Sequence, residues 1–554
     1  MTGTVTTKNH PTIFVLVKQV LSNRKITIAI ILLVILSRVI QLVYYYNIYV
    51  DASYQVMGTQ SLIDGHGVSV PNVFANNLSA TIYTPLINWP PGYSLLFSPF
   101  YYLFNYNYIA AGITFDILSA IALVFICRSI LKILNTPLYL RNVFTLLTGF
   151  FIYYFYFNEC SDAIAITFFL IAFYFTLALL KNQKKPIGST ALLTFFLFAC
   201  ASVKYLFMPA VFIIPLFIFI KGWTDKNSKL KKAGLFSFFS LVILLALLLF
   251  YQKTVGGSAT YISAAGRGFY PENLLEAYPT FPASFLKPDT LPLLSVNKVA
   301  TKKIIFPIYQ VIYIITLMIV ITGFCRQLLK KGFKNLSLMQ SFFYLSFFLS
   351  LSIIILLCIL SLFVEKEAIF SWWLWTYVED GRYYGLPNVL MHLSVFVFYQ
   401  YYSKSPKPLF KYILYFFIFL MIPEMLRGIY FDINRIRNFK KEEYSWQYEN
   451  RFQQYADLVI KKEKQKDPLV KVVVTGTSYN MNHRVVINSH VPPLADVTRI
   501  NNFSVVNTKS PVLLLVMLQK DSLPAYQSFL SQKDVKAAGN FDSFNFYTVP
   551  VTPH

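Results

Sequence analysis

The chain has 554 residues, of which 56% are hydrophobic, 18% are aromatic and only 13% are charged. Soluble domains carry about a quarter charged residues, so this composition excludes a soluble protein and indicates an integral membrane protein. The formal net charge of +24 would suggest a nucleic-acid partner in a soluble protein. No basic motif interleaved with aromatic residues is present, so we expect no nucleic-acid partner and instead ask where the positive charges lie relative to the membrane spans.

Apolar runs of roughly 20 residues predict about eleven membrane-spanning helices. The first run follows a basic N-terminus and is not followed by a small-residue cleavage site, so we expect it to be retained. The block 188–220 is divided in two at Lys204. The candidate spans are 26–46, 107–131, 142–157, 163–180, 188–203, 205–220, 233–251, 304–324, 341–363, 386–402 and 409–426.

The segment "GYSLLFSPFYYLFN", 92–105, decides the topology. It has about 14 residues and contains a proline, which favours an interfacial or re-entrant helix over a span. If it does not cross, the basic loops all fall on the side of the N-terminus, together with a single acid, Asp225, as the positive-inside rule requires. We therefore predict a multi-pass protein of the cytoplasmic membrane with its N-terminus inside and its C-terminal part outside.

Two domains are predicted. Residues 1–428 form the all-α membrane domain, with a first outer loop at 47–91. Residues 429–554 are richer in charges and amides and predict a small α/β domain on the outer face. Its expected strands are 470–476, 511–519 and 545–551, and its expected helices are 446–466 and 523–532.

Asp51 follows the first span directly, in "NIYVDASYQVMGTQSLIDGHG", and the pattern predicts a surface helix containing Tyr54 next. The chain then returns to the membrane through "YTPLINWPPGYSLL", where Trp89 precedes two stiffening prolines and a glycine. An acid at an interface is also typical of a solvated anchor, and that interpretation stays open.

Two further motifs complete a pattern. "NECSDAIAITFF" provides a second outer acid in a short turn, and "RYYGLP" precedes a late span. With the acid after the first span and "PPGYSLLF", these motifs resemble the GT-C glycosyltransferases, nearest to the bacterial branch of protein mannosyltransferases and lipid A aminoarabinose transferases. The resemblance covers about 26–426, and Trp89 departs from the His or Lys that is usual in that family.

The resemblance implies an enzyme that transfers a sugar, with inversion, from a polyprenyl-phosphate carrier to a hydroxyl acceptor on lipid, glycan or protein at the outer face. Asp51 matches the family's base, which takes the proton of the attacking hydroxyl. Glu159 matches the second outer acid and would orient the acceptor or help Asp51 to hold a divalent cation. Glu159 and Asp162 share one helical face, and an ordinary pair of acids at a helix N-terminus explains them equally well.

A phosphate leaving group calls for cations. Lys204 stands alone between two apolar halves, and Arg382 with Tyr383 occupies the family's "RY" position. We expect both basic residues to bind the carrier phosphate, although snorkelling to lipid headgroups is the commoner role of lone interfacial cations.

Other candidates are weaker. Further candidate substrate-binding residues are Tyr54, Asp162, Arg267 and Tyr383. An ordinary polar loop also accounts for Arg267. His66, in the Gly-His-Gly turn, is a weak metal candidate together with Asp51 and Glu159, because no second histidine has useful spacing. No cofactor is certain, and a divalent cation is the one that the resemblance leaves open.

A transporter or flippase for lipid-linked sugars is the alternative function, in which Asp116, Lys204 and Arg38 would line a path through the membrane. A polymerase or ligase of surface polysaccharide would share the carrier chemistry. The candidate residues gather at one predicted face of the membrane, whereas a transporter needs polar groups through its full depth. The sequence therefore favours the transferase.

Overall fold

The computed structural model describes residues 13–44, 50–150, 161–182, 186–259, 268–271, 332–363, 385–402, 408–438, 446–476, 491–494 and 507–553.

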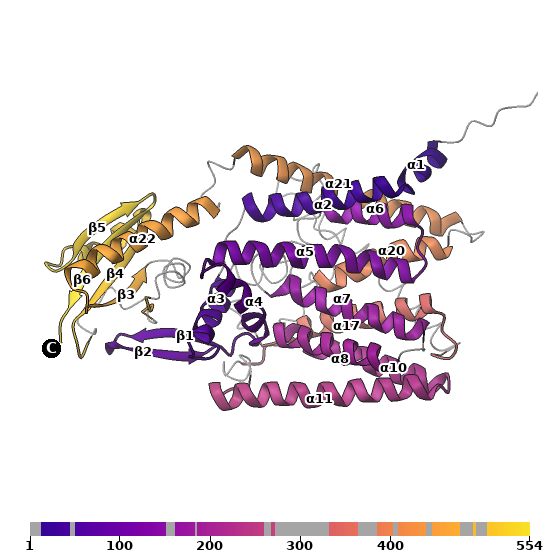
Figure 1. Ribbon diagram of the computed structural model, residues 1–554, viewed down its shortest axis with the longest axis horizontal. Coiled ribbons are helices and arrows are strands. Elements are labelled where there is room, and N and C mark those ends of the chain that lie inside the picture. Colours follow the sequence, from indigo (N-terminus) through magenta and orange to yellow (C-terminus); the bar gives the residue numbers. More distant parts are fainter. Residues whose placement is uncertain are drawn as a thin grey trace, which may run out of the picture.

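Most of this chain is a bundle of long helices that run side by side (Figure 1). Within the described residues, seven helical segments are long and apolar enough to cross a membrane. They include separate segments on either side of Lys204, as predicted, while the expected total of eleven spans stays a prediction. The principal helices are α2 (Arg24–Tyr44), α5 (Tyr108–Ile133), α7 (Asp162–Lys181), α8 (Pro186–Val203), α10 (Ile213–Thr224), α11 (Ser228–Gly256), α17 (Leu338–Ser361), α20 (Gly385–Tyr402) and α21 (Pro408–Asn438). Shorter elements are α1 (Ile13–Leu21), α6 (Leu138–Gly149), η1 (Tyr205–Phe207) and α9 (Met208–Val211).

Two short helices cover one end of the bundle, which we call the α3 end. α3 (Val50–Ile63) and α4 (Gly92–Leu103) lie across the direction of the long helices, as Figure 1 shows. At this end α2, α8 and α11 finish, whereas α5 and α7 begin. α4 has only 12 residues, too few to span a bilayer, as predicted for the segment 92–105.

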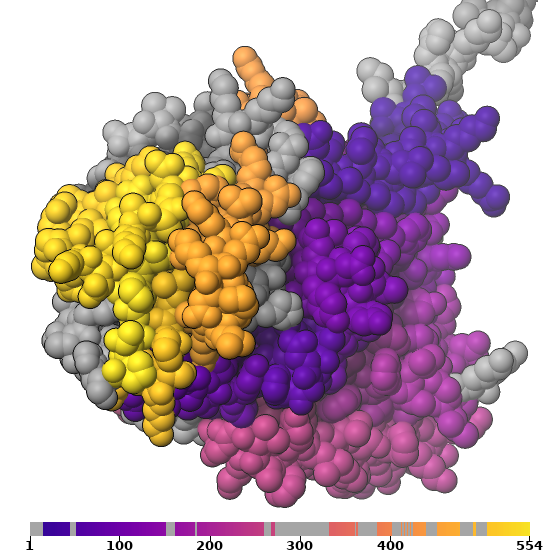
Figure 2. Space-filling model, turned by 60° about the vertical axis from the view of Figure 1, so that its left-hand side comes forward, coloured from indigo at the N-terminus to yellow at the C-terminus, as the bar shows by residue number. Residues whose placement is uncertain are grey.

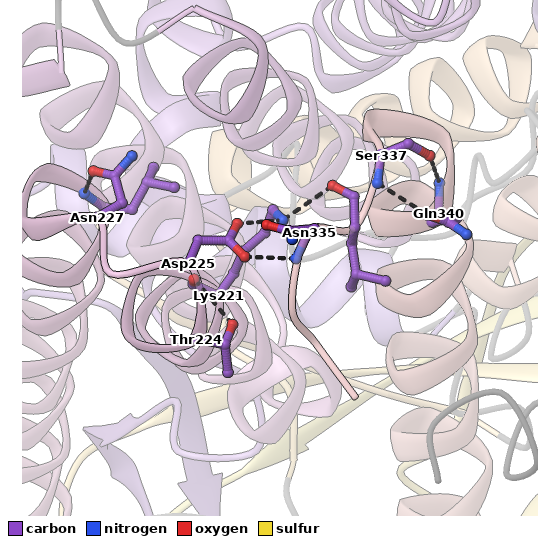
Figure 3. A network of polar contacts seen from close by, with 9 residues as sticks. Lys221, Thr224, Asp225, Asn227, Asn335, Ser337 and Gln340 are labelled. Atoms are coloured by element: carbon purple, nitrogen blue, oxygen red, sulfur yellow. Dashed lines mark hydrogen bonds and ion pairs between the residues drawn. The ribbon is translucent and has the colours of Figure 1, made fainter. Parts of the chain in front are cut away.

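The opposite end of the bundle carries many basic residues of the described chain. It also carries Asp225, the single acid that the sequence assigned to this side. Asp225 accepts hydrogen bonds from the Lys221 ammonium at 2.7 Å and from the backbone N–H of Asn335 at 2.8 Å (Figure 3). Lys221 also donates to the carbonyl of Leu336 at 3.0 Å, just before the capping box that starts α17 at Ser337. Asp225 therefore ties the α10–α11 turn to the start of α17.

The small C-terminal α/β domain is confirmed, while its bounds of 429–554 and its place on the outer face stay predictions. Its sheet has the strand order β3-β4-β6-β5, in which β3 and β4 are parallel and the other pairs are antiparallel. α22 (Trp446–Lys466) packs on one face through Phe452 and Val459. In place of one helix at 523–532 the chain forms a 3-10 helix, η8 (Lys520–Tyr526), followed by the short α24 (Gln527–Leu530). The strands are β3 (Lys471–Gly476), β4 (Val512–Gln519), β5 (Lys536–Phe541) and β6 (Phe544–Val551), of which β5 was not predicted.

A β-hairpin that the sequence did not predict lies in the first loop. β1 (Ser69–Phe74) and β2 (Asn77–Pro85) are antiparallel, and the tight turn lies between the paired residues Phe74 and Asn77. The hairpin extends from α3 toward the C-terminal sheet (Figure 1). Figure 2 looks onto this end, where the yellow and orange C-terminal domain lies against the indigo part of the chain.

Candidate functional site

Asp51 lies in the first turn of α3, where the helix dipole favours an acidic side chain, and it is partly buried. One turn later on the same helix, the ring of Tyr54 stacks on Trp89, with centroids 5.5 Å apart and planes at 25°. Two elements that the sequence singled out, the helix after the first span and the Trp-Pro-Pro-Gly loop, are therefore in direct contact.

Gly92 places the same loop against the end of α8. A Cβ atom at this position would overlap the carbonyl group of Ser202, so the close approach requires glycine. Tyr205 makes a second connection, because its hydroxyl donates to the carbonyl of Ile87 at 3.2 Å and accepts a hydrogen bond from Gln252 of α11. The loop between β2 and α4 is thus held against two residues, Ser202 and Tyr205, that lie before and after Lys204 in the sequence.

Lys204 and Asp162 form a buried ion pair. The Lys204 ammonium lies 2.6 Å from each carboxylate oxygen of Asp162, whose side chain is fully buried, while that of Lys204 is only 10% exposed. Lys204 adopts an extended conformation between α8 and η1 (φ −147°, ψ 122°), which interrupts the helix. This arrangement excludes snorkelling to headgroups, because the ammonium is turned into the protein rather than toward solvent.

Two contacts between neighbouring segments connect α3, which carries Asp51, with the segment that carries the ion pair. They run from Tyr54 of α3 to Trp89, and from Gly92 to Ser202, which lies just before Lys204. The sequence ranked Asp162 below Glu159, and no local signal indicated its pairing with a lysine 42 residues away. Four predicted site residues, namely Glu159, Arg267, Arg382 and Tyr383, lie outside the described residues.

His66 is placed away from Asp51. Its ring stacks on Tyr83, with centroids 3.7 Å apart and planes at 17°, just beyond the C-terminal end of α3. The helix separates the two residues by about 18 Å at 1.5 Å per residue. Asp51 and His66 thus lie at opposite ends of α3, and the assignment of Asp51, Glu159 and His66 as metal candidates stays a prediction. Across the described ranges no group of three or more His, Cys, Asp or Glu side chains could hold a metal.

A second buried polar cluster joins α2, α6 and α21. Arg38 donates to Gln41 at 2.6 Å and to the carbonyl of Gly149, and Ser37 and Gln41 both donate to Asp432. Arg38 is almost fully buried. Arg38 and Lys204 are two of the three residues of the alternative transporter path. They belong to separate clusters, in which each binds neighbouring protein groups.

No protein-family model matches the sequence, and no curated protein matches it. The structure is similar to ArnT from Cupriavidus metallidurans in the apo state, with a TM-score of 0.48 and 9% identity over 94% of this chain and 97% of that chain. ArnT from the same organism bound to undecaprenyl phosphate gives a TM-score of 0.45 and 9% identity with the same coverage.

The structure is also similar to the oligosaccharyltransferase of Archaeoglobus fulgidus in complex with Zn and sulfate, with a TM-score of 0.45 and 10% identity over 91% of this chain and 70% of that chain. Both proteins are GT-C glycosyltransferases, the family that the sequence resembles.

Proposed function

We propose that the protein is an inverting glycosyltransferase that moves a sugar from a polyprenyl-phosphate carrier to a hydroxyl acceptor at the outer face of the cytoplasmic membrane. The observation that carries the proposal is the buried ion pair of Lys204 and Asp162 at the α3 end, joined through Trp89 and Tyr54 to the helix that begins at Asp51.

Lys204 would stabilise the leaving phosphate. When the glycosidic bond breaks, the carrier phosphate gains negative charge, and a fixed cation in a desolvated site stabilises that charge without reorganising. Asp162 supports this role because its carboxylate holds the ammonium in place at 2.6 Å. Arg382 and Tyr383 are proposed as additional groups on the same phosphate, since arginine can bind it with two parallel hydrogen bonds.

Asp51 would act as the general base. The acceptor hydroxyl loses its proton as its oxygen attacks the anomeric carbon, and a carboxylate within hydrogen-bond reach accepts that proton. The stacked rings of Tyr54 and Trp89 form an apolar surface beside the start of α3, which would exclude water from the reacting groups. Glu159 is proposed to orient the acceptor or to hold a divalent cation with Asp51, and Arg267 to cover the acceptor.

The location of the pair suits a donor that is part lipid and part sugar. Lys204 follows α8 and Asp162 begins α7, and both helices are apolar enough to span a bilayer. A prenyl chain can lie along the apolar helices while its phosphate meets the polar groups at their ends. The acceptor would arrive from the aqueous side, where α3 and the hairpin lie.

The test is transfer from a panel of radiolabelled polyprenyl-phosphate sugars by purified protein in matched detergent. Asp51→Asn should fold normally and lose at least about 100-fold in turnover, the range expected for a general base. Asp64→Asn is the matched control, because it neutralises an acid just beyond the other end of α3 and should keep most of the activity.

Wild-type turnover by Asp51→Asn would refute the assignment of the base. Binding of a donor without transfer, equal in both proteins, would favour the transporter, which vesicle flipping assays then test directly. The anomeric configuration of the product, read by NMR, distinguishes inversion from retention. Loss of activity on chelation, restored by one added cation, would identify a metal requirement.

A further inference from the structure

The tip of the β1–β2 hairpin is part of the core of the C-terminal domain. Val73, Ala75 and Leu78 are at most 3% exposed, and they belong to the same apolar cluster as Val473 and Leu494 of that domain. More than 390 residues separate these parts of the chain. The hairpin therefore supplies part of the apolar surface that this face of the sheet needs.

Backbone hydrogen bonds fasten the same tip. The N–H of Val73 donates to the carbonyl of Pro493 at 3.0 Å, and the N–H of Leu78 donates to the carbonyl of Asn507 at 2.9 Å. Asn507 returns a hydrogen bond to the carbonyl of Ala75 at 2.7 Å. The ammonium of Lys471, on β3, donates to the carbonyl of Ser79 at 3.0 Å.

Lys471 is partly buried, and this burial lowers the pKa of its ammonium below the usual value. The hydrogen bond to the hairpin backbone compensates for part of the lost hydration of the ammonium. The contact of Lys471 with Ser79 is thus a directed polar link between the sheet and the hairpin.

The base of the hairpin is fixed to α3. Two glycines with positive φ, Gly65 at 85° and Gly67 at 69°, reverse the chain between α3 and β1, which explains the Gly-His-Gly turn. Between them, His66 stacks on Tyr83 of β2. The N–H of Leu86 donates to the carbonyl of Val68 at 3.0 Å, which closes the hairpin where it meets the Trp-Pro-Pro-Gly loop.

The two arms of the hairpin thus lead to the two sides of the candidate site. β1 is joined through the glycine turn to α3, at whose far end Asp51 lies, and β2 continues directly into the loop that carries Trp89. We propose that the C-terminal domain positions Asp51 and this loop by holding the hairpin, with Leu78 and Lys471 as positioning residues. The effect on catalysis rests on the proposed function, whereas the mechanical coupling to α3 does not.

The first experiment measures this coupling without any substrate. Leu78→Ala removes a buried side chain at the hairpin contact, and Ile460→Ala is the matched control, because Ile460 lies in the apolar cluster on the α22 side of the same domain. Hydrogen–deuterium exchange of the α3 amides should rise at least tenfold in Leu78→Ala and stay near wild type in Ile460→Ala. Equal exchange of α3 in both variants would overturn the proposal.

The second experiment measures catalysis. Leu78→Ala should lower kcat at least fivefold while the KM for the donor changes less than twofold, because the donor phosphate site at Lys204 is retained. In the Asp51→Asn background the same change should cause no further loss, since it acts through Asp51. A full, independent loss in that background would show a merely structural role and overturn the proposal.

Lys471 gives a second variant that leaves the apolar core intact. Lys471→Met should reproduce the loss in kcat, and Lys471→Arg should restore most of it by donating to the same carbonyl. Failure of the arginine variant to differ from the methionine variant would count against the proposal. If wild-type protein transfers no sugar at all, the proposed function fails, while the exchange contrast in α3 still decides whether the domain positions that helix.

Discussion

Breaking the ion pair of Lys204 and Asp162 should separate its structural role from its role in transfer. The perturbations are Lys204→Met, Asp162→Asn and the two combined. Each single change leaves one charged group in a site where the carboxylate is fully buried and the lysine residue is only 8% exposed. The double variant leaves neither charge.

The magnitude follows from the cost of an uncompensated buried charge. Removing one partner of a buried pair costs about 3–5 kcal/mol, whereas replacing both by uncharged groups is often close to neutral. We expect each single variant to lose about 3 kcal/mol in the free energy of unfolding. We expect the double variant to lose about 1–2 kcal/mol, because the new amide leaves one buried polar group imperfectly paired. The interaction energy from the cycle should then be about 4–5 kcal/mol.

Denaturant unfolding in mixed micelles and sugar transfer are measured on the same four proteins. If Lys204 stabilises the leaving phosphate, the double variant regains stability but stays inactive, since it still lacks the cation. Recovery of transfer together with stability would refute the phosphate role and leave the pair as a purely structural link between α7 and α8. If the losses of stability in the two single variants add up in the double variant, the side chains of Lys204 and Asp162 do not interact.

Three further predictions concern packing and buried charge. Gly92→Ala should cost about 1–3 kcal/mol in unfolding free energy and lower transfer, because a methyl group forces the loop away from α8. The control is Gly188→Ala, which should be neutral or slightly stabilising because nothing lies within 4 Å of the added methyl group. Thermal unfolding in detergent compares the two variants. Asp225→Asn should cost about 1–2 kcal/mol by the same measurement without changing kcat, since it acts at the opposite end of the bundle. Arg38→Met should cost about 3 kcal/mol, and combining it with Asp432→Asn should recover part of that loss; full additivity would show that the two groups are not coupled.

The sequence predicted those features that depend on short stretches of chain. The apolar runs on either side of Lys204 indicated two helices, and the length of 92–105 indicated a segment that does not cross. The β1–β2 hairpin was missed because β2 does not alternate between buried and exposed positions along its length, and its buried tip is covered by residues more than 390 positions later. Such burial leaves no periodic pattern in the local sequence.

The candidate site shows the same limit. The sequence marks Lys204 as a costly charge in an apolar block, and it accounts for Asp162 as an acid at the start of a helix. The contact between the two residues depends on how α7 packs against α8, which the sequence does not show. Likewise, Trp89 looked like a departure from the family pattern when considered as a residue type. Its stacking on Tyr54 assigns it a structural role that a motif comparison of single positions does not contain.

The charge balance of the proposed site explains why one lysine is not sufficient. Asp162 neutralises Lys204, so the pair adds directed N–H groups but no net positive charge. In the proposed reaction the carrier phosphate changes from a singly charged diester to a monoester that carries nearly two negative charges at neutral pH. Stabilising that increase calls for a further cation beside Lys204, because only interactions that strengthen in the transition state accelerate the chemical step. Arg382, which is proposed to bind the same phosphate, would supply it, whereas two carboxylates, Asp51 and Glu159, would balance the charge of a divalent cation held between them. In this proposal Lys204 positions the phosphate and stabilises part of its new charge, and the additional cation stabilises the rest.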